Sequence, residues 1–273
     1  MSMTAAVRAA PAPGGERIRI VDTNVNLFHW PFRRLPLDGT AELLEKMEQL
    51  GVESAWAGSF DGLLHRDVGA VNERLAKECE RSRQRLRAFG SVNPTLPDWE
   101  EDLRRCHEVY RMSGIRLHPN YHGYTLANPV FERVVTLASE RRLIIQLAVS
   151  MEDVRTQHPL MLVRDVDLAP LAAVLKRHTR GRVVLLNAGR GSAAAFKSLA
   201  NVPGAYFDIS RVEGSGGVAA FLKTVPESRV LFGTHAPFFI YEASLMKVFE
   251  SELSEAAATR LLHANASDLL RPG

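Results

Sequence analysis

The 273-residue sequence contains few of the features that define several large protein classes. Its only two cysteines, Cys79 and Cys106, lie in Arg- and Glu-rich segments with helical spacing. We therefore expect no disulfide framework, and neither cysteine has a histidine beside it in a context typical of a thiol nucleophile. No run approaches the roughly 18 apolar residues that span a bilayer. Residues 1–17 lack the long apolar core of a signal peptide, and we expect them to form a disordered tail on a cytoplasmic protein.

An excess of one charge sign and the common nucleotide and nucleophile motifs are also missing. The 34 Lys and Arg residues nearly balance 31 Asp and Glu residues, and the two signs are interspersed. This pattern is typical of a solvated surface, so we expect no nucleic-acid partner and no membrane partner. No Gly-x-Gly-x-x-Gly follows the first strand pattern, and no Gly-x-Ser-x-Gly elbow occurs. The expected partner is a small-molecule ligand.

What the sequence does contain is a regular alternation of strand and helix patterns. Eight short apolar or alternating stretches lie at 18–28, 52–58, 86–93, 114–119, 143–149, 183–187, 205–209 and 229–234. Helical patterns lie between them, beginning with 40–50, 67–84 and 98–111, and two or three more follow from 241 to 270. Repeated strand–helix units of roughly 30 residues predict one α/β domain, a (β/α)8 TIM barrel over 18–273 with C-terminal helices. An open doubly wound sheet is the alternative.

Polar side chains stand where several of the predicted strands end. In a parallel barrel the carboxyl ends of the strands meet at one face, so residues far apart in sequence share one pocket there. The strand-end residues are Asn24, Asn26, Arg116, His118, Gln146, Asn187 and His235. The loops after the first and fifth strands add His29, Trp30, Arg155 and His158 to the rim. We predict that these residues form a ligand pocket.

Five short motifs give this pattern a family resemblance. They are Ile20-Val21-Asp22-Thr23, Val92-Asn93-Pro94, Gly114-Ile115-Arg116-Leu117-His118-Pro119, Leu231-Phe232-Gly233-Thr234 with Ala236-Pro237, and Asn265-Ala266. Their order and spacing, from about residue 18 to 271, resemble the amidohydrolase superfamily. The similar branch is amidohydrolase family 2, which contains aminocarboxymuconate-semialdehyde decarboxylase and related lactonases and hydratases. The resemblance implies a TIM barrel, hydrolase or lyase chemistry and, by analogy, a homodimer.

The resemblance also implies metal positions, and this chain departs from the pattern at each of them. Family members typically hold a divalent metal with His-x-His on strand one, His on strands five and six, and Asp on strand eight. Here those positions hold Asn24 and Asn26, Gln146, Asn187 and His235. Zinc binds imidazole, thiolate or carboxylate, and neutral amides are weak ligands for it. With no negative charge expected in the pocket, we predict a degenerate metal site and no cofactor.

Each candidate then has an expected role. With a reference pKa near 6.5, His235 suits general acid–base chemistry at neutral pH. The amides suit hydroxyl or carbonyl groups of a ligand. Arg116 is either a clamp for a substrate carboxylate or the partner of a nearby acid such as Asp208 or Asp22. His158 is a candidate acid or substrate contact.

Three functions follow from this set of residues. The first is a hydrolase, lactonase or decarboxylase that acts on a small polar or carboxylated molecule without a conventional metal. The second is a catalytically inactive barrel that binds or senses a small molecule. The third is a metal-dependent hydrolase in which histidines recruit an ion in a new geometry. The histidines in question are His29, His118, His158 and His235.

Overall fold

A computed structural model describes residues 19–271, so the expected tail at 1–17 lies outside the described residues. It contains the eight expected strands. They are β1 (Ile20–Leu27), β2 (Val52–Ser59), β3 (Leu86–Ser91), β4 (Gly114–Leu117), β5 (Ile144–Ala148), β6 (Val183–Leu186), β7 (Ala205–Asp208) and β8 (Val230–Leu231). They form one sheet in sequence order, and each neighbouring pair is parallel. The predicted (β/α)8 barrel is confirmed.

The barrel is closed by the chain that follows β8. The amide of Thr23 donates to the carbonyl oxygen of Phe232 at 2.8 Å, and the amide of Asn26 donates to that of Ala236 at 2.8 Å. The amide of His235 in turn donates to the carbonyl oxygen of Asn24 at 2.9 Å. The regular eighth strand is therefore shorter than the predicted 229–234, because the chain after Leu231 leaves β7 and bonds to β1 instead.

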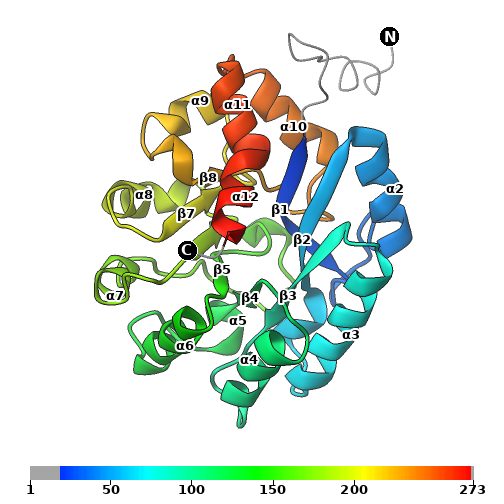
Figure 1. Cartoon of the computed structure of the whole chain (residues 1–273), viewed down its shortest axis with the longest axis vertical. Coiled ribbons are helices and arrows are strands. Elements are labelled where there is room, and N and C mark those ends of the chain that lie inside the picture. Colours follow the sequence, from blue (N-terminus) through cyan, green and yellow to red (C-terminus); the bar gives the residue numbers. More distant parts are fainter. Residues whose placement is uncertain (1–18, 272–273) are drawn as a thin grey trace.

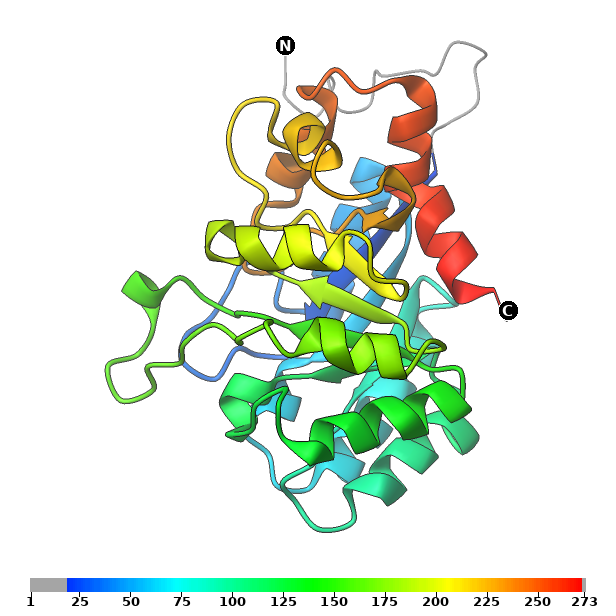
Figure 2. The same ribbon diagram turned by 90° about the vertical axis from the view of Figure 1, so that its left-hand side faces the viewer.

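Helices surround the strands (Figure 1). They are α2 (Thr40–Leu50), α3 (Val68–Arg81), α4 (Trp99–Glu108), α5 (Pro119–His122), α6 (Pro129–Glu140), α7 (Leu171–Arg177), α8 (Ala193–Leu199), α9 (Gly217–Leu222), α10 (Tyr241–Phe249), α11 (Glu255–Thr259) and α12 (Asn265–Leu270). Short 3-10 turns are η1 (Phe60–Leu63), η2 (Val154–Thr156), η3 (Arg190–Ser192) and η4 (Glu227–Arg229), and a π-helical turn, η5 (Arg260–Ala264), joins α11 to α12. The segment between β5 and α7 projects from the barrel body (Figure 2).

Local sequence signals explain several helix ends. The side chain of Asn128 accepts from the amide of Val130 at 2.9 Å, and Pro129 begins α6, as an N-cap and first-turn proline should. Gly51 ends α2 with φ 71°. Thr40 does not cap that helix. It is the first helical residue after Gly39, which provides no side-chain cap.

The barrel interior is layered along its axis. An apolar layer from six strands fills the amino-terminal half, where Trp56 stacks on Phe89 with ring centroids 4.9 Å apart. Gln146 lies two residues beyond Ile144 on the same face of β5, so the polar layer comes next. An aromatic cover follows, made by Trp30, Phe32, Phe60, Tyr121 and Phe238 with their apolar neighbours. The strand-end polar residues are therefore enclosed within the protein.

Two expectations from composition can be compared with the structure. Cys79 and Cys106 are both buried free thiols, so the expected absence of a disulfide between them is confirmed. Over the described range 19–271, no helix is long and apolar enough to cross a membrane.

Candidate functional site

A buried network of amides, a hydroxyl and a carboxylate joins β1, β6 and β7. The Nδ2 of Asn24 donates to Oδ1 of Asn187 and to Oδ2 of Asp208, both at 2.7 Å. The hydroxyl of Ser210 lies 3.0 Å from both Oδ1 of Asp208 and Oδ1 of Asn187. Asn187 also donates from Nδ2 to the carbonyl oxygen of Ser150 at 2.9 Å. Two predicted site residues, Asn24 and Asn187, therefore share an acid that the site prediction did not include.

A second acid fixes the chain that closes the barrel. Asp22 accepts from the amide and hydroxyl of Thr234 at 3.0 and 2.6 Å and from the amide of Asn24 at 2.9 Å. Gly233 permits this close approach, because a Cβ there would lie 2.9 Å from Oδ2 of Asp208 and 3.0 Å from Cβ of Asn24. The position of His235 thus depends on Asp22 and on a glycine.

Arg116 lies fully buried and bonds to neutral groups. Its Nε donates to Oε1 of Gln146 at 2.8 Å, and Nη1 donates to Oδ1 of Asn26 at 2.6 Å and to the carbonyl oxygen of Val25 at 2.9 Å. Gln146 is held in turn by its bond to the carbonyl oxygen of Thr23 at 2.6 Å. The guanidinium orients two predicted amides and forms no ion pair with Asp208 or Asp22 in the described chain, while its role as a clamp for a substrate carboxylate stays a prediction.

Burial shifts the pKa values of the acids and of the arginine in this layer. Desolvation raises the pKa of Asp208 to about 6 and also raises that of Asp22. Desolvation lowers the pKa of Arg116 to about 9, while the carboxylates of Asp208 and Asp22 oppose that shift. The expectation of a site without negative charge is wrong, because Asp208 lies within it. That expectation rested on the metal positions of the family, and Asp208 was expected only as a possible partner of Arg116.

His235 lies at the carboxyl end of the barrel in the left-handed backbone region, with φ 60°. Its Nε2 lies 2.8 Å from the carbonyl oxygen of Met151, which only accepts, so Nε2 carries the proton and Nδ1 is a free acceptor. Burial lowers the pKa of His235 to about 3. A neutral imidazole of such low basicity suits hydrogen bonding better than proton abstraction. The lowered pKa therefore supports the predicted acid–base role of His235 less well than the reference pKa near 6.5 did.

Two more histidines lie under the aromatic cover. His118 is fully buried, and neither ring nitrogen has a hydrogen-bond partner in the described chain. His122 has its ring centroid 5.9 Å away, and its Nε2 donates to the carbonyl oxygen of Gly62 at 3.0 Å. Desolvation lowers the pKa of His118 well below its usual range and that of His122 to about 4. Both rings are therefore neutral at neutral pH.

Four predicted rim residues lie outside this enclosed layer. His158 is exposed and stacks on Phe32, with centroids 5.8 Å apart. Exposed Arg155 pairs with Asp153 at 2.8 Å, and exposed His29 lies 3.3 Å from Asp38. Trp30 is buried at the centre of the aromatic cover rather than at an open rim. The structure thus brings the strand-end residues into one layer and leaves His29, Arg155 and His158 on its outside.

A cavity of about 550 Å³ adjoins the network on the β7–β8 side. Ser210 lines it and thereby links it to Asp208 and Asn187. Arg211 and Lys247 also line it, and each lies over the ring of Phe239, at 5.8 and 5.9 Å from the centroid. Burial lowers the pKa of Lys247, whose Nζ donates to the carbonyl oxygen of Ser210 at 2.6 Å. The predicted site residue Arg155, paired with Asp153, and the acid Glu213 also line this cavity. Arg211 and Lys247, which form no ion pair in the described chain, together with the ring of Phe239 suit a carboxylated ligand.

The sequence pattern did not place Asp208 among the site residues, and it did not indicate the cations Arg211 and Lys247. Asp208 ends β7, so its place at a strand end was a usable signal, and Ser210 follows it by two residues. Lys247 could not be found this way, because it lies in the last turn of α10, far from any strand end. Helices after the last strand carry no strand-end signal.

The strands and helices define a (β/α)8 barrel with polar residues at its strand ends, and comparison gives its family. The model of the family described as amidohydrolase matches residues 58–271, and the chain belongs to that family. No curated protein matches the chain.

Solved structures share the fold at low identity. A manganese complex of 5-carboxyvanillate decarboxylase from Novosphingobium aromaticivorans is 12% identical with a TM-score of 0.74, and the match covers 99% of each chain. The corresponding decarboxylase from Sphingomonas paucimobilis is 13% identical with a TM-score of 0.73, over 94% of this chain and 100% of that one. The 2,6-dihydroxybenzoate decarboxylase from Rhizobium is 15% identical with a TM-score of 0.69, over 91% and 98%. At these identities the likeness shows the fold.

The residues at the strand ends do not fit a manganese or zinc centre. Between residues 19 and 271, no three His, Cys, Asp or Glu side chains gather in a way that could hold a metal ion. Asp208, the acid bonded to the side chain of Asn24, already accepts hydrogen bonds from Asn24, Ser210 and the amide of Asn187. Asn24 presents its Nδ2 to that acid, and an N–H donor cannot coordinate a cation.

Proposed function

We propose that this member of the amidohydrolase family binds a small carboxylated molecule at the carboxyl end of its barrel. It acts on that molecule as a hydrolase or lyase without a conventional divalent metal. The cavity of about 550 Å³ beside the buried network supports this proposal, because it has the size of small-molecule sites. In it the ligand carboxylate faces Arg211 and Lys247, and an apolar part of the ligand packs on Phe239.

One observation carries the proposal: several buried polar atoms at the carboxyl ends of the barrel strands have no hydrogen-bond partner. They include Oδ1 of Asn24, Nδ2 of Asn26, Nδ1 of His235 and both ring nitrogens of His118. Buried polar groups in folded proteins nearly always have a partner. Several unpartnered donors and acceptors in one layer favour a polar ligand, with ordered water as the occupant when the ligand is absent.

The residues present also suggest how a proton is handled. With a pKa raised to about 6, Asp208 changes protonation state near neutral pH, which suits a general acid or base better than the pKa of about 3 at His235. Ser210 connects Asp208 to the cavity through its hydroxyl. In this scheme Asp208 exchanges a proton with the ligand through the hydroxyl of Ser210.

Binding and turnover test the proposal together. We would screen tag-free protein against a panel of lactones, amides and carboxylic acids by calorimetry and product detection. Lys247→Met and Arg211→Met should each weaken binding of carboxylated hits about tenfold or more, as expected for loss of a charge-assisted bond. Arg177→Met is the matched control, because Arg177 pairs with Glu132 on a distant helix. Unchanged binding in both cavity variants would contradict the proposal that a ligand carboxylate contacts Arg211 and Lys247.

A catalytically inactive binding barrel is the second candidate, and the low basicity of His235 favours it. Asp208→Asn separates the two candidates, because it should abolish turnover of a bound substrate while binding is retained. If no bound compound is turned over by the native protein, the barrel is a binding protein. Elemental analysis tests the third candidate, since one equivalent of zinc, manganese or iron in tag-free protein would contradict the metal-free proposal.

A further inference from the structure

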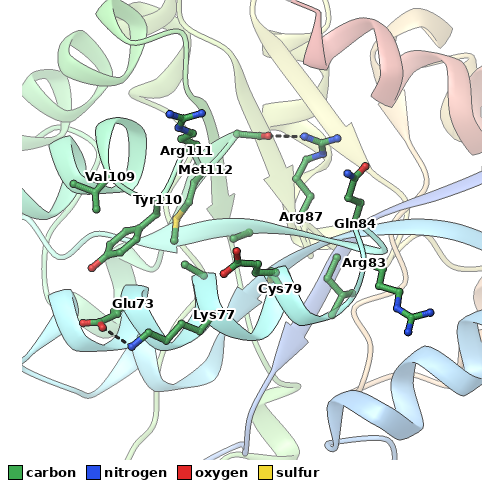
Figure 3. Close-up of a pocket in the computed structure, with 15 residues that line it drawn as sticks. Glu73, Lys77, Cys79, Arg83, Gln84, Arg87, Val109, Tyr110, Arg111 and Met112 are labelled. Carbon is green, nitrogen blue, oxygen red and sulfur yellow. Dashed lines mark hydrogen bonds and ion pairs between the residues drawn. The ribbon is translucent and has the colours of Figure 1, made fainter.

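The amino-terminal face of the barrel, opposite the candidate site, carries three grooves that share lining residues. The largest, of about 820 Å³, lies beside β3 between α3 and the turn after α4 (Figure 3). It shares Arg87 and Ser113 with a groove of about 240 Å³. That groove shares Arg142 and Arg182 with a third, of about 670 Å³. The three form one continuous depression across the starts of β3 to β6.

Arginine without an acidic partner dominates this depression. We call the six residues the arginine band: Arg83, Arg87, Arg111, Arg142, Arg180 and Arg182. None of the six forms an ion pair with a residue in the described range, although most exposed arginines of the chain do. Five of them are exposed, whereas Arg182 is half-buried and donates to the carbonyl oxygens of Leu269 and Arg142. The band is therefore a solvent-facing cationic surface.

The backbone at three of these arginines is unusual. Arg83, Arg111 and Arg142 follow helices α3, α4 and α6, each in the loop that leads to the next strand, and have φ of 52°, 51° and 56°. Glycine is the usual residue in this left-handed region after a helix, as at Gly51 after α2 and Gly204 before β7. An L side chain there is strained, and such strain is concentrated at functional positions. Arginine occupies the strained position in three successive loops on one face.

Helix stability gives only part of the reason for these arginines. A cation near a helix carboxyl end interacts favourably with the helix dipole. That effect needs a charge in the last turn, which α7 obtains with Lys176 and Arg177 at ordinary helical positions. It does not require a strained residue, and it does not explain Arg87 or Arg180, which lie outside helices.

We propose that the arginine band binds an acidic peptide segment of a partner protein. Arginine forms planar, bidentate contacts with carboxylates. Among the lining residues of the three grooves, Lys77 is the one lysine, and it is paired with Glu73. The same grooves contain the acids Glu73, Glu80, Glu140 and Asp268, of which Glu80 has no ion pair in the described chain. These acids would repel the densely charged backbone of a nucleic acid. A peptide with spaced carboxylates accommodates them.

The test uses the full chain and a fluorescein-labelled dodecapeptide of alternating Glu and Ser, with a Gln and Ser peptide as the uncharged control. Fluorescence anisotropy should show salt-sensitive binding of the acidic peptide alone. The triple variant Arg83→Gly, Arg111→Gly, Arg142→Gly should weaken binding at least about tenfold, as three charge-assisted contacts are lost. The midpoint of thermal unfolding should stay unchanged or rise, because glycine relieves the backbone strain.

Two control variants distinguish a loss of binding caused by lost charge from one caused by a disturbed fold. The same three positions changed to Lys should keep more of the binding than the glycine variant. Arg104→Gln removes a paired, exposed arginine outside the grooves and should leave binding unchanged. Equal binding of both peptides, or full binding by the glycine variant, would overturn the proposal. Tighter binding of a single-stranded RNA dodecamer than of the acidic peptide at physiological salt would overturn the partner assignment.

Discussion

Replacing Asp208 by asparagine tests the physical basis of the buried network. The side chain is 3% exposed, and its carboxylate accepts from Asn24, Ser210 and the amide of Asn187. Desolvation nonetheless outweighs these bonds and raises the pKa from 3.8 to about 6. Asparagine keeps the shape and removes the charge. The variant therefore isolates the cost of the buried carboxylate from the packing around it.

The sign and size of the effect follow from proton linkage. The folded state holds the proton of Asp208 more tightly than the unfolded state does, so the carboxylate destabilises the fold. This cost is absent below pH 3.8, grows as the pH rises to about 6 and is constant above. A shift from 3.8 to about 6 corresponds to about 3 kcal/mol. About 2 kcal/mol of that change occurs between about pH 4.5 and 7.5.

Urea unfolding at a series of pH values measures the effect. The free energy of unfolding of the native protein minus that of Asp208→Asn should fall by about 2 kcal/mol between about pH 4.5 and 7.5. Asp153→Asn serves as the control, because the pKa of exposed Asp153 is held below its usual range by Arg155 and its difference should be nearly flat. A flat difference for Asp208→Asn would refute the claim that burial dominates at this acid.

Three further changes examine the layers around this acid. Gly58→Ala should destabilise the fold by about 2 kcal/mol in urea unfolding, because its Cβ would lie 2.7 Å from the Arg116 guanidinium; an unaffected midpoint would show that Arg116 moves freely. For His122, burial lowers the pKa to about 4, so the native protein loses stability as the pH falls below about 6.5. His122→Gln should therefore be less pH-dependent by about 2 kcal/mol between about pH 7.5 and 5, and parallel pH profiles would contradict this. Trp30→Ala should cost about 3–5 kcal/mol and raise hydrogen exchange of the β1 amides, whereas unchanged exchange would show that the aromatic cover does not seal the barrel.

The periodicity of the sequence predicts most of the fold. Continuous apolar runs such as 143–149 and 183–187 are typical of parallel strands covered on both sides, and both form barrel strands. The end of the eighth strand could not be predicted this way. Phe232 to Ala236 bond to β1 rather than continuing along β7, and that choice depends on contacts with residues more than 200 positions away.

The site was only partly predictable, for a different reason. Strand-end position correctly places Asn24, Gln146 and Asn187 in one layer, because all parallel strands end at the same face. Strand-end position does not show which of these polar groups hydrogen-bond to one another. The side chain of Asn24 donates to Asp208 and Asn187, and Gln146 accepts from Arg116, so many of the predicted ligand-binding atoms bond within the protein instead.

The amides that stand at the metal positions of the family, together with Arg116, form one set of interacting buried polar groups. Arg116 is the buried cation of the barrel, and its charge is opposed at a distance by Asp208 and Asp22. Neutral amides between them, at Asn26 and Gln146, bond directly to the guanidinium and so reduce its desolvation cost without adding charge. Histidines at these amide positions would add groups that can charge beside a buried arginine. The amides therefore suit a barrel whose fixed cation is a side chain, and Arg116 and the amides are expected to depend on one another.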